Sequence, residues 1–230
     1  MTVEICCGTV EEVRLAVRAG ADRIEFNSAL ETGGVTPSRG ALCLAIESAR
    51  WEGVKSAVML RPRGGDFCYS RSDFEAMALD GSFLKDEGAD YIVFGILKPD
   101  GNVDAERCYS MMGQCGSRKT PLSFVFHMAF DETPDWRRAL DTLVELKFSR
   151  ILSKGQAVNA EAGAETLRHM IRYAGSRIEI LPGGGVRAHN VRDIIKKTGC
   201  DQIHFSLRKN EKEFFSEQEI KDLIALCRRP

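Results

Sequence analysis

The chain has 230 residues, of which 43% are hydrophobic and 28% are charged, and its formal net charge is −1. This composition is ordinary for a globular protein, and the near-zero charge gives no support for binding to nucleic acid or to a membrane surface. No apolar stretch approaches the roughly 20 residues that a membrane-spanning helix needs. The N-terminal stretch MTVEICC lacks the pattern of a signal peptide, so we expect a cytoplasmic protein.

Eight short runs have the composition of buried β-strands, and a helical pattern follows each of them. They lie at residues 3–6, 23–26, 56–60, 91–94, 122–126, 150–152, 177–181 and 202–205. Thr9, Ser70 and Ser216 each stand three residues before an acidic residue, which is the capping-box spacing at a helix start. Pro37 is expected at the first position of the second helix. Glycines that follow the helical patterns mark their ends.

Eight cysteines are scattered along the chain, and none of them forms a C-x-x-C pair. In a cytoplasmic protein of this length we expect reduced thiols, most of which act as small core residues. The ligand spacing of a zinc finger is also missing from the sequence. The cysteines therefore predict neither a disulfide framework nor a structural zinc site.

One pattern, G-[AC]-D-x-I-x-F, occurs three times, at residues 20–26, 88–94 and 199–205. In each copy the glycine ends a helix, the aspartate lies in a turn and a strand begins, so one αβ unit is used three times. Eight strand–helix units without a linker predict a single (β/α)8 TIM-barrel domain over residues 1–230. A doubly wound sheet is the alternative, but its G-x-G-x-x-G fingerprint is missing after the first strand.

The repeat also predicts which side chains face the interior of the barrel. Its Ile and Phe positions share one face, which we assign to the helices, so the residue between them points inward. This rule turns Glu25, Val93 and His204 inward. The same alternation turns inward Glu4, Cys6, Met59, Arg61 and, at the end of the fifth strand, His127. Such charged and imidazole groups differ from the branched aliphatic filling of a purely structural barrel.

The loop after the third strand has the sequence RPRGGD and is the first candidate for a binding site. Barrel enzymes place their chemistry where strands end and the following loops begin. Arg61, Arg63 and Asp66 would surround this mouth, and arginine offers a rigid fork of donors that matches carboxylate or phosphate. An internal ion-pair network that only satisfies buried charge is the competing interpretation, although such networks are weak evidence for stability.

The segment FHMAFD, at the end of the fifth strand, adds His127 and Asp131 to the same rim. The ordinary pKa of histidine lies near neutrality, so His127 is the best single candidate for proton transfer. A histidine at a strand end is as often a hydrogen-bonded polar residue without a catalytic role. Glu25 and Arg61, which are expected at the same mouth, favour the catalytic interpretation.

The glycine-rich segment LPGGGV ends the seventh strand, where many barrels bind phosphate through backbone amides. Gly183 and Gly184 are the candidates for this role, although a tight turn explains the glycines equally well. The segment after the eighth strand contains no glycine, but Arg208 and Lys209 could supply positive charge there.

Several stretches resemble the CutC family of copper-homeostasis proteins. They are, in order, VEIC, GADRIEF, GGVTPS, RPRGGDF, GADYIVFG, FHMAFD and PGGG, and they extend over nearly the whole chain. The resemblance implies a TIM barrel, a cytoplasmic location, a homodimer or higher homo-oligomer, and an association with copper tolerance. It implies no established reaction.

The resemblance also implies a Cu(I) site at the ends of the first two strands, where family members often carry cysteines. Copper(I) prefers thiolate and thioether ligands. This sequence keeps Cys6, but Asn27 occupies the second position and Met128 stands where an arginine is usual. The expected copper site is therefore Cys6, with His127 or His204 as further ligands.

Two functions remain from this evidence. One is copper handling through Cu(I) bound at Cys6. The other is a lyase or isomerase of the acid–base type, which acts on a small anionic, sugar-like substrate that is phosphorylated or not. In this enzyme Glu25 would be the general base and His127 the general acid. Arg61 and Arg63 would bind the anionic group of the substrate. The other candidate residues are Asp131 for catalysis and Glu4, Arg63, Asp66, Gly183, Gly184, His204 and Arg208 for binding. A non-catalytic module that binds an anionic metabolite is a third, weaker alternative.

Overall fold

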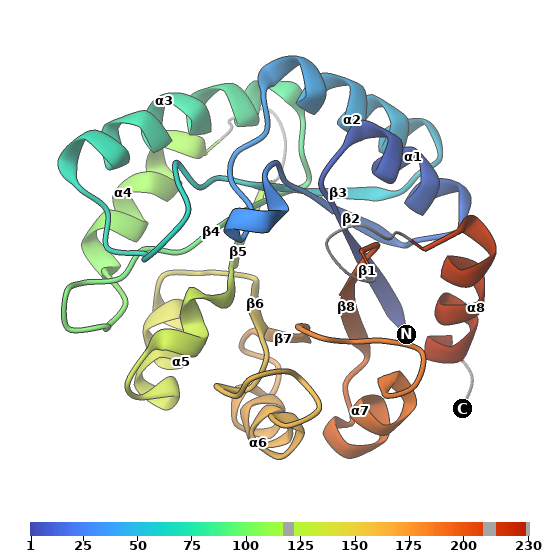
Figure 1. The fold of residues 1–230 in the computed structure, drawn as a ribbon. Coiled ribbons are helices and arrows are strands. Elements are labelled where there is room, and N and C mark those ends of the chain that lie inside the picture. The colour runs from blue at the N-terminus through green and yellow to red at the C-terminus, as the bar shows by residue number, and fades with distance from the viewer. Residues whose placement is uncertain (117–121, 209–214, 229–230) are drawn as a thin grey trace.

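The computed structural model describes residues 1–116, 122–208 and 215–228. Eight parallel strands alternate with eight helices along the chain, as predicted (Figure 1). The strands are β1 (Thr2–Cys7), β2 (Arg23–Phe26), β3 (Lys55–Met59), β4 (Tyr91–Phe94), β5 (Ser123–Phe126), β6 (Arg150–Ser153), β7 (Glu179–Pro182) and β8 (Gln202–Ser206). The helices are α1 (Val10–Arg18), α2 (Arg39–Trp51), α3 (Arg71–Glu87), α4 (Ala105–Cys115), α5 (Trp136–Glu145), α6 (Ala164–Ala174), α7 (Val191–Thr198) and α8 (Glu217–Arg228). The predicted TIM barrel is confirmed.

The strands form one sheet that curves into a nearly closed barrel, in the order β7-β6-β5-β4-β3-β2-β1-β8. The first and last strands pair, with Thr2 opposite Gln202 and Glu4 opposite His204. Among the described residues, backbone hydrogen bonding between neighbouring strands is interrupted only between β7 and β8. There the side chain of Gln202 reaches across, and its Nε2 donates to the carbonyl of Ile180 at 3.5 Å.

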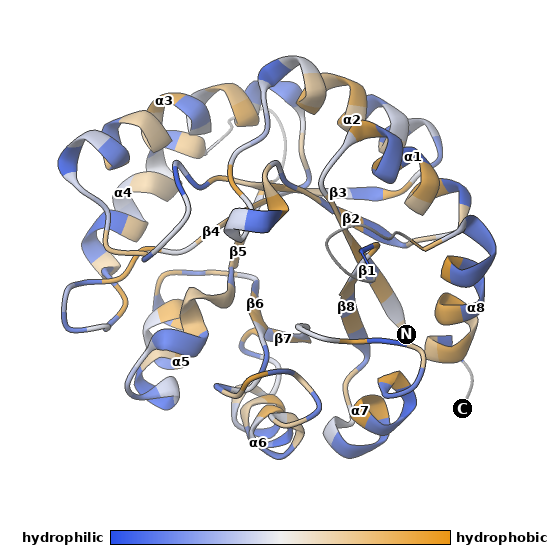
Figure 2. Ribbon diagram, in the orientation of Figure 1, coloured by the Kyte–Doolittle hydropathy of each residue, from blue (hydrophilic) through white to orange (hydrophobic). Residues whose placement is uncertain are grey.

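The helices surround the strands, and the main hydrophobic core fills the layer between them (Figures 1 and 2). This core contains the Ile and Phe of all three sequence repeats, namely Ile24, Phe26, Ile92, Phe94, Ile203 and Phe205. A separate small cluster lies inside the barrel and consists of Ala57, Met59, Val93 and Val125. The alternation of side chains along each strand therefore follows the predicted facing rule.

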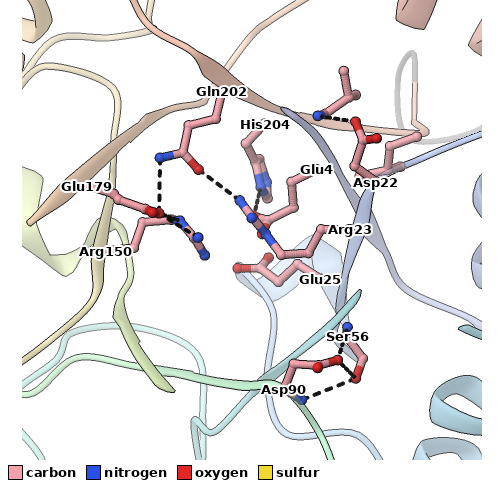
Figure 3. A network of polar contacts seen from close by, with 12 residues as sticks. Glu4, Asp22, Arg23, Glu25, Ser56, Asp90, Arg150, Glu179, Gln202 and His204 are labelled. Carbon is pink, nitrogen blue, oxygen red and sulfur yellow. Dashed lines mark hydrogen bonds and ion pairs between the residues drawn. The ribbon is translucent and has the colours of Figure 1, made fainter. Parts of the chain in front are cut away.

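The aspartate of the repeat has a structural task in at least two of the copies (Figure 3). Asp22 accepts a hydrogen bond from the amide of Val3 at 2.8 Å, and Asp90 accepts one from the amide of Ser56 at 2.9 Å. Each carboxylate thus joins the turn before its own strand to the start of the preceding strand. These bonds help to set the register of neighbouring strands.

The helix starts follow the predicted caps except at one position. Ser70 and Asp73 form a reciprocal capping box at the start of α3. The prediction for Pro37 is wrong, because α2 begins two residues later and Ser38 is its N-cap, with its hydroxyl accepting from the amide of Ala41. Pro37 therefore lies just outside the helix, where its fixed backbone angle still suits the extended entry of the chain.

All eight cysteines are free thiols, and six of them are buried. This agrees with the expectation that they act mainly as small core residues. Within the described ranges, none of the helices combines the length and the apolar composition that crossing a bilayer would require.

Candidate functional site

A cavity of about 270 Å³ opens at the carboxyl ends of the strands, and we call it the mouth cavity. Its walls are formed by Cys6, Glu25, Asn27, Leu30, Gly33, Met59, Arg61, Phe67, His127, Met128, Leu152, His204, Ser206 and Arg208. Glu25, Arg61 and His127 thus meet at one mouth, as the strand alternation predicted. A larger hollow of about 450 Å³ lies on the outer surface between α1 and α2, away from the strand ends.

Cys6 and Glu25 lie together at the floor of the mouth cavity, where Asn27 joins them. The Nδ2 of Asn27 donates to Oε2 of Glu25 at 2.9 Å and lies 3.5 Å from Sγ of Cys6. Burial raises the pKa of the Cys6 thiol well above its ordinary value, and the carboxylate of Glu25 adds to the effect. Burial also raises the pKa of Glu25. Asn27 therefore lies beside Cys6, at the position where a second cysteine would complete a two-thiolate copper site.

His204 faces the same group of residues from β8, and Glu4 fixes its orientation (Figure 3). The Nδ1 of His204 lies 2.7 Å from Oε1 of Glu4, which also pairs with Arg23. Burial alone would lower the pKa of His204, but the hydrogen bond to Glu4 and the nearby carboxylates raise it. Burial alone would raise the pKa of Glu4, but Arg23 and His204 hold it below its ordinary value. Glu4 therefore orients His204 and does not itself line the cavity.

The potential ligand atoms of Cys6, Glu25 and His204 all lie within 4.8 Å of one another. A thiol, a carboxylate and an imidazole at this spacing could close around one metal ion. Each of these three side chains comes from a different strand end, so the barrel itself sets their positions. This group is the metal-binding candidate of the described residues.

A polar network continues below this group toward the opposite end of the barrel (Figure 3). Arg23 donates to Oε1 of Gln202 at 3.0 Å, and Gln202 donates to Glu179 at 3.3 Å. Glu179 pairs with the buried Arg150 at 2.6 Å. Together with Glu4 these residues form the ion-pair network that the sequence analysis considered as the competing interpretation, but it lies beneath the mouth and does not include Arg61.

His127 lines the cavity as a neutral imidazole. Its Nδ1 accepts a hydrogen bond from the amide of Ala129 at 3.2 Å, which places the ring proton on Nε2. Burial and the charge of Arg61 lower the pKa of His127 to about 3. The expectation of an ordinary histidine pKa, on which its role as a general acid rested, therefore differs from the structure. His127 offers a hydrogen-bond donor and no transferable charge near neutral pH.

Arg61 is 4% exposed and joins two loops at the rim of the cavity. Its Nη1 donates to the carbonyls of Gly33 and Gly34 at 3.0 and 3.1 Å, and its Nη2 donates to the carbonyl of Gly65 at 2.6 Å. The guanidinium also lies over the ring of Phe67, 4.7 Å from its centre. Most donors of Arg61 are thus used on backbone, while its positive charge remains at the mouth.

Arg63, Asp66 and Asp131 were expected at the mouth but have other contacts. Arg63 pairs with Asp66 at 3.0 Å and with Asp73 at 3.1 Å, so it stabilises its own loop. Asp131 accepts hydrogen bonds from the end of β6 and the residues after it, among them one from the hydroxyl of Ser153 at 2.7 Å. None of the three borders the mouth cavity.

The glycine-rich segment after β7 is also used within the fold. The amide of Gly183 donates to the carbonyl of Ser153 at 3.0 Å, and a β-carbon at Gly183 would lie 2.8 Å from Leu152. Gly183 and Gly184 are not among the residues that line the mouth cavity, so their binding of phosphate stays a prediction. Arg208 does line it and lies 3.6 Å from Glu31. Lys209 lies outside the described residues.

Several residues of the site had no predicted role. Met59 and Met128 are among the residues that line the cavity. Gly95 lies directly against His127, because a β-carbon there would be 2.7 Å from the imidazole ring. The glycine that follows GADYIVF was a usable signal, since a glycine at a strand end often marks a close approach by a neighbouring group.

Comparison with known proteins places the chain in one family. A sequence model described as the CutC family matches residues 1–209. A protein named family protein CutC from Treponema denticola is 45% identical over 211 residues, which are 92% of this chain and 83% of that protein. The human protein named copper homeostasis protein cutC homolog is 41% identical over 206 residues, which are 90% of this chain and 73% of the human protein.

Solved structures agree with this assignment. A crystal structure of a CutC protein from Streptococcus agalactiae has a TM-score of 0.83 and 34% identity, and the match covers 89% of this chain and 98% of that one. Thiamine phosphate pyrophosphorylase from Pyrococcus furiosus has a TM-score of 0.64 with 16% identity, over 98% of this chain and 95% of that one, which shows the shared barrel fold alone. From the family model, the curated relatives and the structural match, the chain belongs to the CutC family.

Proposed function

We propose that the protein takes part in copper homeostasis by binding Cu(I) at the floor of the mouth cavity. The observation that carries this proposal is the close approach of Cys6, Glu25 and His204, whose ligand atoms lie within 4.8 Å of one another. The names of the human and Streptococcus agalactiae relatives support the link to copper.

The donor set fits a soft ion in part. Cys6 supplies a thiolate and His204 an imidazole, and Met59 and Met128, whose side chains carry thioethers, are among the residues that line the same cavity. Binding requires the thiol to lose its proton, which the burial of Cys6 opposes. Because Asn27 replaces a second thiolate, we propose that this site binds Cu(I) more weakly than a two-cysteine site would.

The first prediction is tested by competition with a Cu(I) chelator under anaerobic conditions. Cys6→Ala should abolish binding, and Asn27→Cys should tighten it at least tenfold, because the new thiol would lie beside Cys6. Cys7→Ala is the matched control: this thiol is also buried but packs in the main hydrophobic core, so its loss should leave copper affinity unchanged. Binding that is independent of Cys6 would contradict this placement of the ion.

The proposal includes a cytoplasmic location and a homo-oligomer. The homo-oligomer is supported by two exposed apolar side chains of α2. Trp51 is 87% exposed, and Leu44 on the same helix is partly exposed. Large apolar side chains at the surface are typical of contact regions between subunits. Light scattering coupled to gel filtration measures the subunit number directly.

An acid–base enzyme is the second candidate, and a different observation favours it. Glu25 is a buried carboxyl group that lines the cavity together with His127, whose Nε2 has no partner among the described residues, and with the charged Arg61. We propose Glu25 as the base and His127 as a neutral hydrogen-bond donor to a developing oxyanion, because an imidazole of low pKa cannot act as a protonated acid. Glu25→Gln should then abolish any turnover.

A further inference from the structure

We propose that the mouth cavity also binds a small hydroxylated oxyanion, such as a hydroxy acid or a sugar phosphate, with its charged end near Arg61 and an oxygen at Nε2 of His127. This inference goes beyond copper binding and requires no turnover. It rests on a buried charge, a buried donor and the walls of the cavity between them.

The buried charge is that of Arg61. Arg61 is 4% exposed, and its Nη atoms donate to three backbone carbonyls. Carbonyl dipoles do not supply a counter-charge, and none of the ion pairs within the described ranges involves Arg61. An unpaired charge removed from water is costly, so structures normally place an opposite charge beside it. The mouth cavity borders Arg61 and is the space in which an anion would provide this charge.

The buried donor is Nε2 of His127. Since Nδ1 accepts from the amide of Ala129, Nε2 carries the proton, yet this atom has no hydrogen-bond partner in the part of the chain that the structure describes. A buried donor without a partner costs about 1–3 kcal/mol. Phe67 lies over the ring of His127, with 4.8 Å between the ring centres, and itself belongs to the cavity wall. An oxygen of a ligand in the cavity would satisfy this donor.

The other walls define the class of ligand. The cavity volume of about 270 Å³ lies at the lower end of ligand pockets, which usually measure about 300–1,000 Å³, so the ligand is small. Glu25, Asn27 and Ser206 present acceptors and donors that suit hydroxyl groups. Arg208 adds a second guanidinium to the cavity wall. Together these groups fit a short hydroxylated chain with an anionic end.

The test uses metal-free protein and three matched probes in isothermal titration calorimetry. Glycerate carries a carboxylate, glycerol 3-phosphate carries a phosphate, and glycerol is the uncharged control. At least one charged probe should bind saturably while glycerol does not, and the affinity should fall as salt is added. The comparison of the two charged probes identifies carboxylate or phosphate as the preferred group. If neither charged probe binds, or if glycerol binds equally well, the proposal is wrong.

Two arginine variants separate the cavity from the general charge of the rim. Arg61→Gln should weaken binding of the charged probe at least tenfold. Arg63→Gln is the matched control, because Arg63 belongs to the same loop but pairs with Asp66 and Asp73 outside the cavity, and it should bind normally. Equal losses in both variants would contradict a specific site. Circular dichroism and the melting temperature establish that each variant is folded.

A spectroscopic measurement on the unaltered protein avoids any folding defect of Arg61→Gln. With ¹⁵N-labelled histidine, addition of the bound probe should shift the Nε2–H resonance of His127, which is assigned with His127→Phe. No shift at saturation would contradict the placement of the oxyanion. Arg61→Gln distinguishes this proposal from copper binding, because Arg61 is not one of the three proposed metal ligands and the variant should lose the anionic probe and keep Cu(I).

Discussion

Gly95 and His127 illustrate how one residue sets the position of another at this site. The imidazole lies so close to Gly95 that an added β-carbon would be 2.7 Å from both Cε1 and Nδ1 of the ring. The ring also contacts Phe67, and its Nδ1 accepts a hydrogen bond from the amide of Ala129. A larger residue at position 95 must therefore displace the imidazole, and with it the donor that faces the cavity.

We predict that Gly95→Ala destabilises the protein by about 1–3 kcal/mol, because overpacking a filled core forces side chains and backbone to shift. Urea denaturation measures this change in the free energy of unfolding. Gly113→Ala is the control: Gly113 lies in α4 with no atom near the position of its β-carbon, so the same substitution should be neutral or stabilise by about 0.5–1 kcal/mol. Equal effects at the two positions would show that the contact with His127 is unimportant.

At the level of single residues, the sequence predicted where side chains lie in the barrel better than it predicted their protonation states. Glu25, Arg61 and His127 were placed at one mouth because side chains alternate along a strand. The neutral state of His127 was not predicted, since it depends on burial and on a guanidinium that lies 66 positions away in the sequence. The number of residues between Arg61 and His127 does not show that the guanidinium charge acts on the imidazole in the folded protein.

At the level of elements, the loops after the strands differ most from the sequence analysis. Asp131 was expected at the mouth because it closely follows β5, but it stabilises the loop after β6. Its carboxylate accepts from the amide of Lys154 at 2.9 Å and the amide of Gln156 at 2.8 Å. Gln156 has a φ of 54°, a left-handed conformation that is unfavourable for a residue with a side chain. Loop conformation depends on such local partners, which a strand-end rule does not contain.

We predict that Asp131→Asn destabilises the protein by about 1.5–3 kcal/mol, because the amide group of asparagine would place donors against backbone donors. Asp135→Asn is the matched control. Asp135 caps α5 through a single oxygen, and asparagine is an equally good N-cap, so this variant should unfold within about 0.5 kcal/mol of wild type. Chemical denaturation of both variants gives the comparison, and similar losses would indicate a general effect of removing negative charge.

The strands were predicted more accurately than the loops because they are short, apolar and bounded by recognisable turns. The runs at 23–26 and 91–94 match β2 and β4, whereas the run at 177–181 begins two residues before β7. Element ends depend on hydrogen bonds to neighbouring strands, and the sequence does not display those neighbours. The number of strands follows from the eight apolar runs, and their parallel direction follows from the helical pattern that separates each run from the next.

At the level of the whole molecule, the stability should depend on pH through His127. Its pKa is about 3 in the folded protein and about 6.5 in the unfolded chain, so below pH 6.5 only the unfolded chain gains this proton. The His127 imidazole therefore disfavours folding as the pH falls from 6.5 toward 3, with a slope of up to about 1.4 kcal/mol per pH unit, whereas His204, whose pKa is raised, contributes in the opposite direction. Glu4 acts at lower pH, because its depressed pKa gives stability that is lost only below about 4.5.

We predict that His127→Gln removes this dependence. Unfolding free energies of wild type and variant should differ by a constant amount above pH 7, and the variant should gain relative to wild type as the pH falls to 5. Glu4→Gln provides the contrast, since its effect on the pH profile should be confined to the region below about pH 4.5. Parallel profiles of wild type and His127→Gln would mean that the imidazole is protonated in the folded protein.

The break in the ladder between β7 and β8 gives the barrel one place at which its radius can change. Seven strand pairs are joined by backbone hydrogen bonds, so widening the ring elsewhere would break bonds worth about 0.5–1.5 kcal/mol each. At this joint the strands meet mainly through side chains, such as Gln202 across from Ile180. A small outward rotation of β8 would carry His204 away from β7 while its pairing with β1 stays intact. We therefore expect the ring to open at this joint before it opens between any other pair of neighbouring strands.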